Sequence, residues 1–331
     1  MSRRNSVPVA GLAAVVAGFA ACAGPSDDRS FAQEASGLCE APRMVSELPA
    51  ELLEASGITR DPRHPGVFWA HNDSANPAEL VAVDTAGRLI ATVPLEQAPN
   101  RDFEDIAAGP CPSGSCLYLA DIGDNLAVHS SVRVHRLPLP DLPDRVGSSS
   151  ASGAPTLPPL RPETSWTLVY PAGPRDAESL AIDGERGELI IVTKGRENIV
   201  ELYGLPLSDP AGRPGSPDTL HRVGRLQVPI GSGTSQFITA ADLSPDGSRL
   251  VVRSYTTLYE FAWTGTAGFD TLAVPAASSL LGALEAQGEG VAWDVSGETL
   301  LLVSEGRRGR PPTISRIRCP APPGASPASQ G

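Results

Sequence analysis

The sequence lacks the short motifs that mark several large enzyme classes. It contains no G-x-S-x-G nucleophile elbow, no Walker phosphate-binding loop, no H-E-x-x-H metal motif and no G-x-G-x-x-G after an apolar run. Each of these motifs places a nucleophile, a phosphate-binding backbone or a pair of metal ligands at a fixed spacing. Their absence argues against an α/β-hydrolase, a P-loop enzyme, a zincin or a Rossmann dehydrogenase.

The chain also has little positive charge and little room for long helices. Its 331 residues carry 26 Lys and Arg against 38 Asp and Glu, which gives a net charge of −12. Nucleic acids and anionic membranes are bound by clustered Lys and Arg, so neither is an expected partner. Glycine and proline each number 33, which favours dense turns, and aromatic residues make up only 5%. This composition fits an exported, soluble body.

Long hydrophobic runs are absent except at the N-terminus. Two arginines there precede an apolar stretch over residues 7–21, which is too short for a stable membrane span. The Phe-Ala-Ala-Cys sequence that ends at Cys22 resembles a bacterial lipobox, whose cysteine is lipidated after cleavage. We predict a signal peptide over 1–21, a lipidated Cys22, and a flexible tether over 22–38. The alternative is an ordinary signal peptide.

This N-terminus predicts where the protein resides. A lipidated cysteine would anchor the exported chain to the cell envelope, at the outer membrane in a Gram-negative cell. An ordinary signal peptide would instead give a secreted or periplasmic protein. Contact with a membrane is expected only through the lipid.

Four cysteines follow the N-terminal segment: Cys39, Cys111, Cys116 and Cys319. An even number in an exported chain favours disulfides, and three pairings are possible. The short interval between Cys111 and Cys116 suits a local hairpin, which leaves Cys39 to pair with Cys319. Metal binding by these cysteines is the alternative, but no C-x-x-C pair is present.

A short pattern recurs five times and marks a polar residue in a small, apolar strand. The marked residues are Ser56, Glu104, Glu178, Thr239 and Glu289. They lie 48, 74, 61 and 50 residues apart, and a more hydrophobic strand follows most of them. Repeats of this length, rich in β-formers and turns, are typical of four-stranded propeller blades. We predict an all-β fold with a single β-propeller over 39–319. Five blades are favoured, and six blades and a β-sandwich are the alternatives.

The ends of the predicted propeller suggest how the ring closes. The last blade shows only three strands, and the run Met44–Leu48 precedes the first blade without a partner. Pairing this N-terminal strand with the last blade would complete it, and a Cys39–Cys319 disulfide would hold the seam. Residues 141–163, rich in Ser, Pro and Gly, are predicted to form a disordered insertion, and 320–331 a disordered tail.

Polar side chains are expected around the mouth of the central channel. In a propeller, the starts of the first strands and the ends of the second strands meet on one face. Aligning the blades on the marked residues gathers six candidate metal ligands there: Asn72, Asp73, Glu104, Asp121, Glu178 and Glu289. Three further residues are candidate contacts to a bound ligand: Lys194, Arg253 and Glu305.

Carboxylates that converge on a narrow axis repel one another. They take up protons, form ion pairs or bind a metal ion. Their oxygen donors suit Ca²⁺, which is the candidate cofactor; if the site holds no Ca²⁺, no cofactor is predicted. Two alternatives stay open, namely a water-filled channel lined by ion pairs and a pair of catalytic carboxylates. His71 is the only histidine near the mouth, and it is the candidate general base if the protein is an enzyme.

Seven segments carry a resemblance to a known group of proteins: Ala55–Ile58, Trp69–Ser74, Arg101–Ala107, Asp121–Asn125, Ala177–Leu180, Thr193–Lys194 and Ser244–Leu250. They resemble secreted bacterial β-propeller proteins with TolB-like or WD40-like repeats. This resemblance implies a propeller and export, and it implies little about activity. More remotely, the channel mouth is similar to that of calcium-dependent lactonase, phosphotriesterase and phytase propellers. That similarity implies Ca²⁺ ligands at Glu104, Glu178, Asn72 and Asp121, and Lys194 or Arg253 at a bound anion.

The leading hypothesis is a lipid-anchored, extracytoplasmic propeller. It would bind an envelope protein or a small anionic molecule on its polar face, with Ca²⁺ in a structural role. The alternative is a Ca²⁺-dependent hydrolase of lactones, esters or phosphate esters, and a purely structural envelope scaffold is the third hypothesis. The protein is expected to be a monomer.

Overall fold

The structure is a computed structural model of the chain, and it divides into two compact units, Met1–Glu34 and Ala35–Gly331. It describes residues 39–143, 154–196, 199–207, 216–228, 237–266, 272–273, 275, 277–281, 285–307 and 309–320. The predicted signal peptide, Cys22 and the tether lie outside these residues, as does the tail beyond residue 320. The described part holds no helix with the length and hydropathy needed to cross a membrane.

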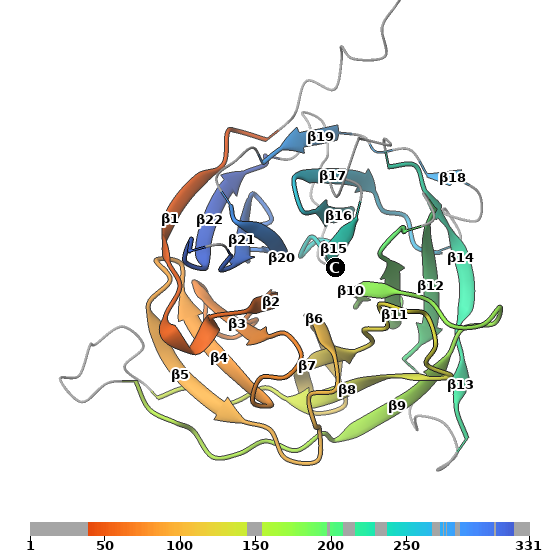
Figure 1. The fold of residues 1–331 in the computed structure, drawn as a ribbon, viewed down its shortest axis with the longest axis horizontal. Coiled ribbons are helices and arrows are strands. Elements are labelled where there is room, and N and C mark those ends of the chain that lie inside the picture. Colours follow the sequence, from red (N-terminus) through yellow and green to blue (C-terminus); the bar gives the residue numbers. More distant parts are fainter. Residues whose placement is uncertain are drawn as a thin grey trace, which may run out of the picture. The chain divides into compact units, whose positions relative to one another are not determined.

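The described strands form five sheets arranged as blades around an axis (Figure 1). Blade 1 consists of β2 (Ala55–Arg60), β3 (Val67–Asn72), β4 (Glu79–Asp84) and β5 (Leu89–Pro94). Blade 2 consists of β6 (Phe103–Cys111), β7 (Gly114–Asp121), β8 (Val132–Pro138) and β9 (Thr164–Val169), with β13 (Asp218–Thr219) at its edge. Blade 3 consists of β10 (Ala177–Asp183), β11 (Glu188–Thr193), β12 (Val200–Pro206) and β14 (His221–Leu226), with β18 (Leu272–Ala273) at its edge.

The last two blades complete the ring. Blade 4 consists of β15 (Ile238–Leu243), β16 (Arg249–Ser254), β17 (Thr257–Ala262) and β19 (Ala277–Leu280). Blade 5 consists of β20 (Gln287–Trp293), β21 (Thr299–Glu305), β22 (Thr313–Arg318) and β1 (Arg43–Glu47). A 3₁₀ turn over Ala50–Leu52 precedes β2. The prediction of an all-β propeller with five blades is confirmed, and the six-bladed alternative is excluded.

The two ends of the propeller close the ring as the sequence predicts. Strand β1 pairs antiparallel with β22, so the N-terminal strand becomes the fourth strand of blade 5. The Cys39–Cys319 disulfide joins the chain on either side of this pair, and the Glu40 amide donates to the Arg318 carbonyl at 2.7 Å. The Cys111–Cys116 disulfide closes the hairpin between β6 and β7. Both predicted disulfides are confirmed.

Apolar side chains hold neighbouring blades together. Each of five hydrophobic clusters combines residues of two adjacent blades; Trp69 and Leu117, for example, belong to the cluster between blades 1 and 2. A blade is therefore covered on both faces, and strands such as β3 and β11 are buried over their whole length. This explains why their sequences read as continuous apolar runs rather than as alternating patterns.

The strands nearest the axis are built from small residues because five of them converge there. A Cβ added to Gly57 would lie 2.8 Å from the amide nitrogen of Ile106 in the next blade. One added to Gly290 would lie 2.6 Å from the carbonyl oxygen of Ser56. Contacts of this length are prohibited, so glycine at these positions sets how closely the inner strands approach.

Two segments differ from the sequence prediction. A reading of consecutive β-rich runs along the sequence predicts the fourth strand of blade 4 at residues 271–274. The structure instead has β19 at 277–280 as that strand, and β18 pairs in parallel with β14 of blade 3. Residues 154–163 belong to the predicted disordered insertion, yet they lie along β5. The Thr92 amide donates to the Pro155 carbonyl, and the Thr92 carbonyl accepts from the Leu157 amide. The Leu160 amide donates to the Pro94 carbonyl at 2.9 Å. An exposed strand edge can accept such a partner even where prolines prevent a full strand.

Candidate functional site

Each innermost strand has a β-bulge at the position that the repeated pattern marks. The pairing register shifts at 55–58 in β2, 103–105 in β6, 177–179 in β10, 238–240 in β15 and 288–291 in β20. All five marked residues lie within these steps. A bulge sets two residues against one partner residue and redirects a side chain out of the normal alternation. The repeat in the sequence is therefore a repeated bulge on the inner strands.

The bulged residues divide into two groups by what their side chains do. Ser56 donates to the Glu104 carbonyl at 2.7 Å, and Thr239 donates to the Glu289 carbonyl at 2.9 Å. These two hydroxyls link blade 1 to blade 2 and blade 4 to blade 5. The three glutamates, Glu104, Glu178 and Glu289, instead line a pocket on the axis.

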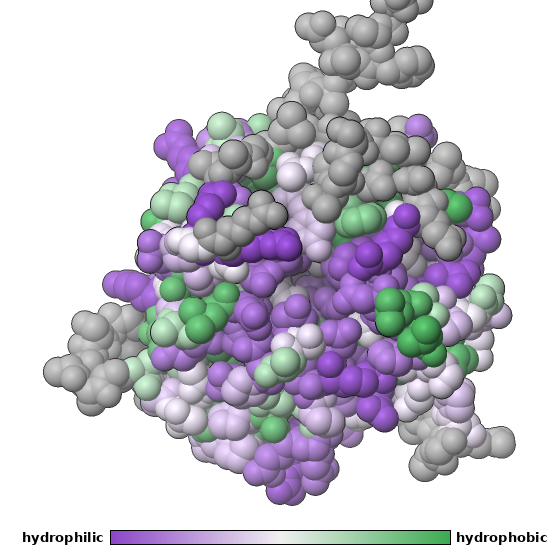
Figure 2. Space-filling view, viewed as in Figure 1, coloured by the Kyte–Doolittle hydropathy of each residue, from purple (hydrophilic) through white to green (hydrophobic). Residues whose placement is uncertain are grey.

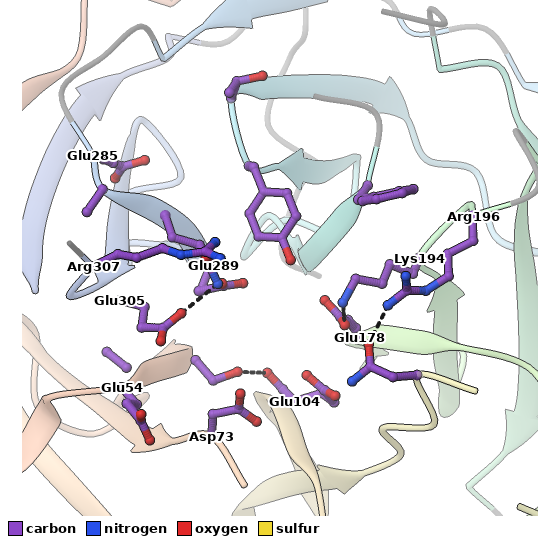
Figure 3. A pocket seen from close by; sticks show the side chains of 18 residues that line it. Glu54, Asp73, Glu104, Glu178, Lys194, Arg196, Glu285, Glu289, Glu305 and Arg307 are labelled. Carbon is purple, nitrogen blue, oxygen red and sulfur yellow. Dashed lines mark hydrogen bonds and ion pairs between the residues drawn. The ribbon is translucent and has the colours of Figure 1, made fainter. Parts of the chain in front are cut away.

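The axial pocket has a volume of about 570 Å³ and is strongly acidic. Figure 2 shows it as a hydrophilic hollow in the middle of the propeller face. Seven carboxylates line it against three cations, and Figure 3 labels all ten: Glu54, Asp73, Glu104, Glu178, Glu285, Glu289, Glu305, Lys194, Arg196 and Arg307. Because of this excess of negative charge, the empty pocket attracts cations and repels free anions.

Three carboxylates come together on one side of the pocket. Asp73 follows β3, Asp102 immediately precedes β6, and Glu104 lies in the bulge of β6. One oxygen of each lies within 4.8 Å of the others, a spacing that a single metal ion can bridge. Gly123 leaves the space for them, because a Cβ at that position would clash with the carboxylates of both Asp102 and Glu104. We call these three residues the carboxylate cluster.

The carboxylate cluster is electrostatically unfavourable when it is fully ionised. The pKa of Glu104 is raised well above its usual value, first by burial and then by the charges of Asp73 and Asp102. Burial also raises the pKa of Asp73 and of Asp102, and Asp73 is the main charge that acts on Asp102. No arginine or lysine in the described part of the chain forms an ion pair with any of the three. The cluster therefore binds protons or a cation more favourably than three separate carboxylates would.

The opposite side of the pocket is neutralised by the protein itself. Glu178 forms an ion pair with Lys194, the only lysine in the chain. The Gln287 amide donates to Glu289 at 2.6 Å and to Glu305 at 2.5 Å, and its oxygen accepts from Arg307. Burial raises the pKa of Glu289 to about 8. These groups are internally paired, which distinguishes them from the carboxylate cluster (Figure 3).

Four of the predicted site residues lie outside the pocket lining. The Asn72 side chain holds a turn, because it accepts from the Glu54 amide at 3.0 Å and donates to the Glu51 carbonyl at 2.7 Å. Asp121 accepts from the Asp102 amide at 2.9 Å and so positions the segment that enters β6. Both side chains therefore hold backbone segments that adjoin the carboxylate cluster.

Arg253 and His71 are buried, and their side chains interact with groups other than the carboxylate cluster. Arg253 has no exposed surface, pairs with Glu285 and donates to the Gly290 carbonyl at 2.8 Å. His71 is also fully buried, its Nδ1 lies 3.0 Å from the Asn72 carbonyl, and burial lowers its pKa to about 4. The structure therefore brings together Asp73, Glu104, Glu178, Glu289, Lys194 and Glu305 of the predicted residues.

Asp102 is the cluster residue that the sequence analysis missed. Residues i and i+2 of a regular strand lie on the same face of a sheet. If β6 continued regularly back to residue 102, Asp102 and Glu104 would therefore point the same way. This i, i+2 spacing was the feature of the sequence that could have identified Asp102 as a site residue. It is weak, because the bulge at 103–105 breaks the alternation on which it rests.

Asp105, the neighbour of Glu104, lies at the axis itself. Its carboxylate accepts from the Ile106 amide at 2.9 Å, from Leu180 of blade 3 at 2.9 Å and from Ala241 of blade 4 at 3.3 Å. Blades 2 and 4 are not neighbours in the ring, so this side chain reaches across the axis. At the equivalent position the other blades have Gly57, Ser179, Ala240 and Gly290, which leave space for one long side chain.

Comparison with known proteins adds little to this description. No family model and no curated protein match the chain. Among solved structures, the chain is similar to a gluconolactonase from Xanthomonas campestris, at 13% identity and a TM-score of 0.40, over 85% of this chain and 95% of that one. It is also similar to U3-55K, at 12% identity and a TM-score of 0.37, over 80% of this chain and 67% of that one. At these scores neither similarity supports an inference about function.

Proposed function

We propose that the propeller binds a divalent cation at the carboxylate cluster, and a small anionic ligand above it in the axial pocket. The observation that carries the proposal is the convergence of Asp73, Asp102 and Glu104, whose oxygens lie within 4.8 Å of one another without an ion-pair partner among the described residues. Such a set has only oxygen donors, which favours Ca²⁺ over metals that prefer nitrogen or sulfur. Gly123 provides the room.

A bound cation would also explain how an acidic pocket accepts an anion. Two positive charges at the cluster would reverse the local sign of the field on that side of the pocket. The ammonium of Lys194 and the guanidinium of Arg196 lie among the residues that line the same pocket. An anionic group placed between them and the cation would meet positive charge on both sides. Binding of such a ligand is therefore expected to require the cation.

The proposal is tested by calorimetric titration of the purified protein with Ca²⁺. We expect one binding event, and about tenfold or greater loss of affinity in Asp102→Asn and Glu104→Gln, because each change removes one charged ligand. Glu305→Gln is the matched control, since it removes a carboxylate from the same pocket but outside the cluster. Ca²⁺ competes with protons for Glu104, whose pKa is raised, so the affinity of the wild-type protein should fall as the pH is lowered.

Thermal unfolding separates loss of the site from misfolding. Without Ca²⁺, Glu104→Gln should unfold at a higher temperature than the wild-type protein, because it removes a carboxyl group whose ionisation is opposed by burial and by the charges of Asp73 and Asp102. With Ca²⁺, the wild-type protein and Glu305→Gln should gain more stability than Asp102→Asn and Glu104→Gln. Equal Ca²⁺ affinities in all four proteins would show that the carboxylates only line the channel.

A Ca²⁺-dependent hydrolase of lactones, esters or phosphate esters is the second candidate. It is favoured by one observation, namely that the cluster borders an open pocket rather than a sealed cavity. There the cation would polarise the carbonyl or phosphoryl oxygen of a substrate. The Ca²⁺-loaded protein of the titration provides the sample for this assay, and turnover that survives in Glu104→Gln would exclude the site as its origin.

We further propose that Cys22 is lipidated and tethers the propeller to the cell envelope. The support is the sequence alone, since the apolar stretch that ends at Cys22 has the form of a lipoprotein signal. Metabolic labelling with radioactive palmitate should label the wild-type protein, and Cys22→Ser should abolish the label and release the protein into the soluble fraction. Equal labelling of both proteins would contradict the proposal.

A further inference from the structure

A second cleft lies beside the axial pocket, on blade 3, and the proposed cation site leaves it unexplained. It has a volume of about 460 Å³ and is lined by the loop after β7, the loop after β11, and residues of β12 and β14. Asn125 and Arg196 line both the cleft and the axial pocket. The hydrogen bond between these two side chains therefore forms part of the wall that separates them.

The cleft carries an excess of positive charge on an acidic protein. Glu201 accepts from Arg175 at 3.0 Å, and the Nε atoms of Arg222 and Arg225 lie 3.5 and 3.9 Å from the same carboxylate. Arg196 pairs with Asp176. Three arginines line the cleft against two carboxylates, and Arg222 joins them through Glu201. This part of the surface therefore has a local excess of two positive charges, whereas the whole chain has a net charge of −12.

The exposed fractions of these side chains show which of them are accessible to a binding partner. The side chain of Glu201 is 13% exposed, while those of Arg222 and Arg225 are 45% and 44% exposed. The carboxylate thus lies deeper than the two arginines and holds them in place, and nearly half of each arginine side chain stays accessible to a partner. Preorganised guanidinium groups of this kind bind carboxylates with two parallel hydrogen bonds.

Apolar side chains border the same cleft. Leu126, which is 81% exposed, and Ile199, which is 41% exposed, line the cleft, and Val128, which is 65% exposed, lies two residues beyond Leu126. The loop that carries Leu126 and Val128 is held in place by Asp124, whose carboxylate accepts from the Val128 amide at 2.9 Å and from the His129 amide at 2.7 Å. Figure 2 shows hydrophobic surface on this face, over the region of β11 and β12. Neighbouring aliphatic side chains that stay exposed to solvent are typical of a binding surface.

We propose that this cleft binds an extended, acidic segment of a partner protein, in which Asp or Glu side chains are interspersed with aliphatic ones. Its carboxylates would bind the exposed arginines, and its aliphatic side chains would pack on Leu126, Val128 and Ile199. Charge complementarity selects this occupant, since the surrounding surface repels acidic partners and the cleft attracts them. An excess of two charges is too small for stable binding of nucleic acid at physiological salt.

The test is a selection of random dodecapeptides displayed on phage against the immobilised wild-type protein, in the presence of EDTA. The chelator makes the result independent of the proposed cation site. We expect enrichment of peptides that combine acidic and aliphatic residues. Their affinity, measured by fluorescence anisotropy, should fall at least about tenfold in Arg222→Glu/Arg225→Glu and decrease with added salt.

Two further variants keep the result interpretable. Leu126→Ser/Val128→Ser changes only exposed side chains of the loop and should also weaken the selected peptides. Arg88→Glu/Arg161→Glu is the matched control, because it reverses two exposed arginines outside the cleft and should leave binding unchanged. The proposal is overturned if no peptide is enriched or if the enriched peptides bind all variants equally. Binding to anionic lipid vesicles that is lost in Arg222→Glu/Arg225→Glu would also overturn it, in favour of a membrane contact.

Discussion

Replacing Cys39 and Cys319 by serine should lower the free energy of unfolding by about 5 kcal/mol. The disulfide joins residues 280 positions apart and therefore restricts the unfolded chain over almost the whole propeller. It also holds β1 against β22, the only place where the ring is closed by strands from opposite ends of the described chain. Urea unfolding of the oxidised protein, followed by fluorescence, measures the difference.

The second disulfide provides a control for this prediction. Cys111 and Cys116 are five positions apart, so replacing both by serine should cost only about 2 kcal/mol, since a short loop loses less entropy on closure. Hydrogen exchange should locate the effect of the first replacement in β1 and β22. If the two replacements lower stability equally, or if β1 keeps its protection without Cys39, the ring does not depend on the terminal disulfide.

Replacing Asp105 by alanine should destabilise the propeller by about 3 kcal/mol. The change leaves the amides of Ile106, Leu180 and Ala241 without their acceptor, and these amides belong to three different blades. Because the side chain is completely buried, water cannot replace it without opening the axis. Thermal and urea unfolding should both show the loss.

The pH dependence of this loss identifies the carboxyl group as its cause. Burial raises the pKa of Asp105 well above its usual value. A group whose pKa is raised on folding contributes most stability below its unfolded pKa, and this contribution decreases as the pH rises through the folded pKa. The difference between the wild-type protein and Asp105→Ala should therefore be larger at acidic than at neutral pH.

Ser179 is the matched control for Asp105. It occupies the equivalent position in blade 3, is equally buried, and its hydroxyl has no hydrogen-bond partner among the described residues. Ser179→Ala should change stability by less than about 1 kcal/mol, since no hydrogen bond is lost. A similar loss of stability in Asp105→Ala and Ser179→Ala would mean that any change at the axis is disruptive. The three hydrogen bonds of Asp105 would then not be the cause of the loss.

The agreement between sequence and structure is closest where local patterns repeat. The five marked residues, the incomplete last blade and the four cysteines predicted the blade number and the closure. The sequence prediction and the structure differ where a segment pairs with a blade other than its own. Strand β18 and residues 154–163 attach to the edges of neighbouring blades, and an edge accepts any chain that supplies backbone hydrogen bonds. Local sequence carries little information about such a choice.

The candidate site shows the same division. Spacing alone placed Asp73, Glu104, Glu178 and Glu289 at one end of the channel, because the period of the blades fixes where inner strands begin. It could not separate a free carboxylate from a paired one. Glu178 is neutralised by Lys194 and the carboxylate cluster is not, and this difference depends on side chains that are far apart in the chain.

The sequence by itself thus determined the propeller, its five blades, its closure and the acidic character of its axis, because each follows from a local pattern that is repeated or from pairing of the two ends. Only the tertiary structure decided which carboxylates share a cation-sized space, that Arg253 and His71 are buried away from it, and that four arginines gather on blade 3. The physical reason is that a bulge redirects a side chain by a local twist, and that charge balance is set by neighbours in space rather than by neighbours in the chain.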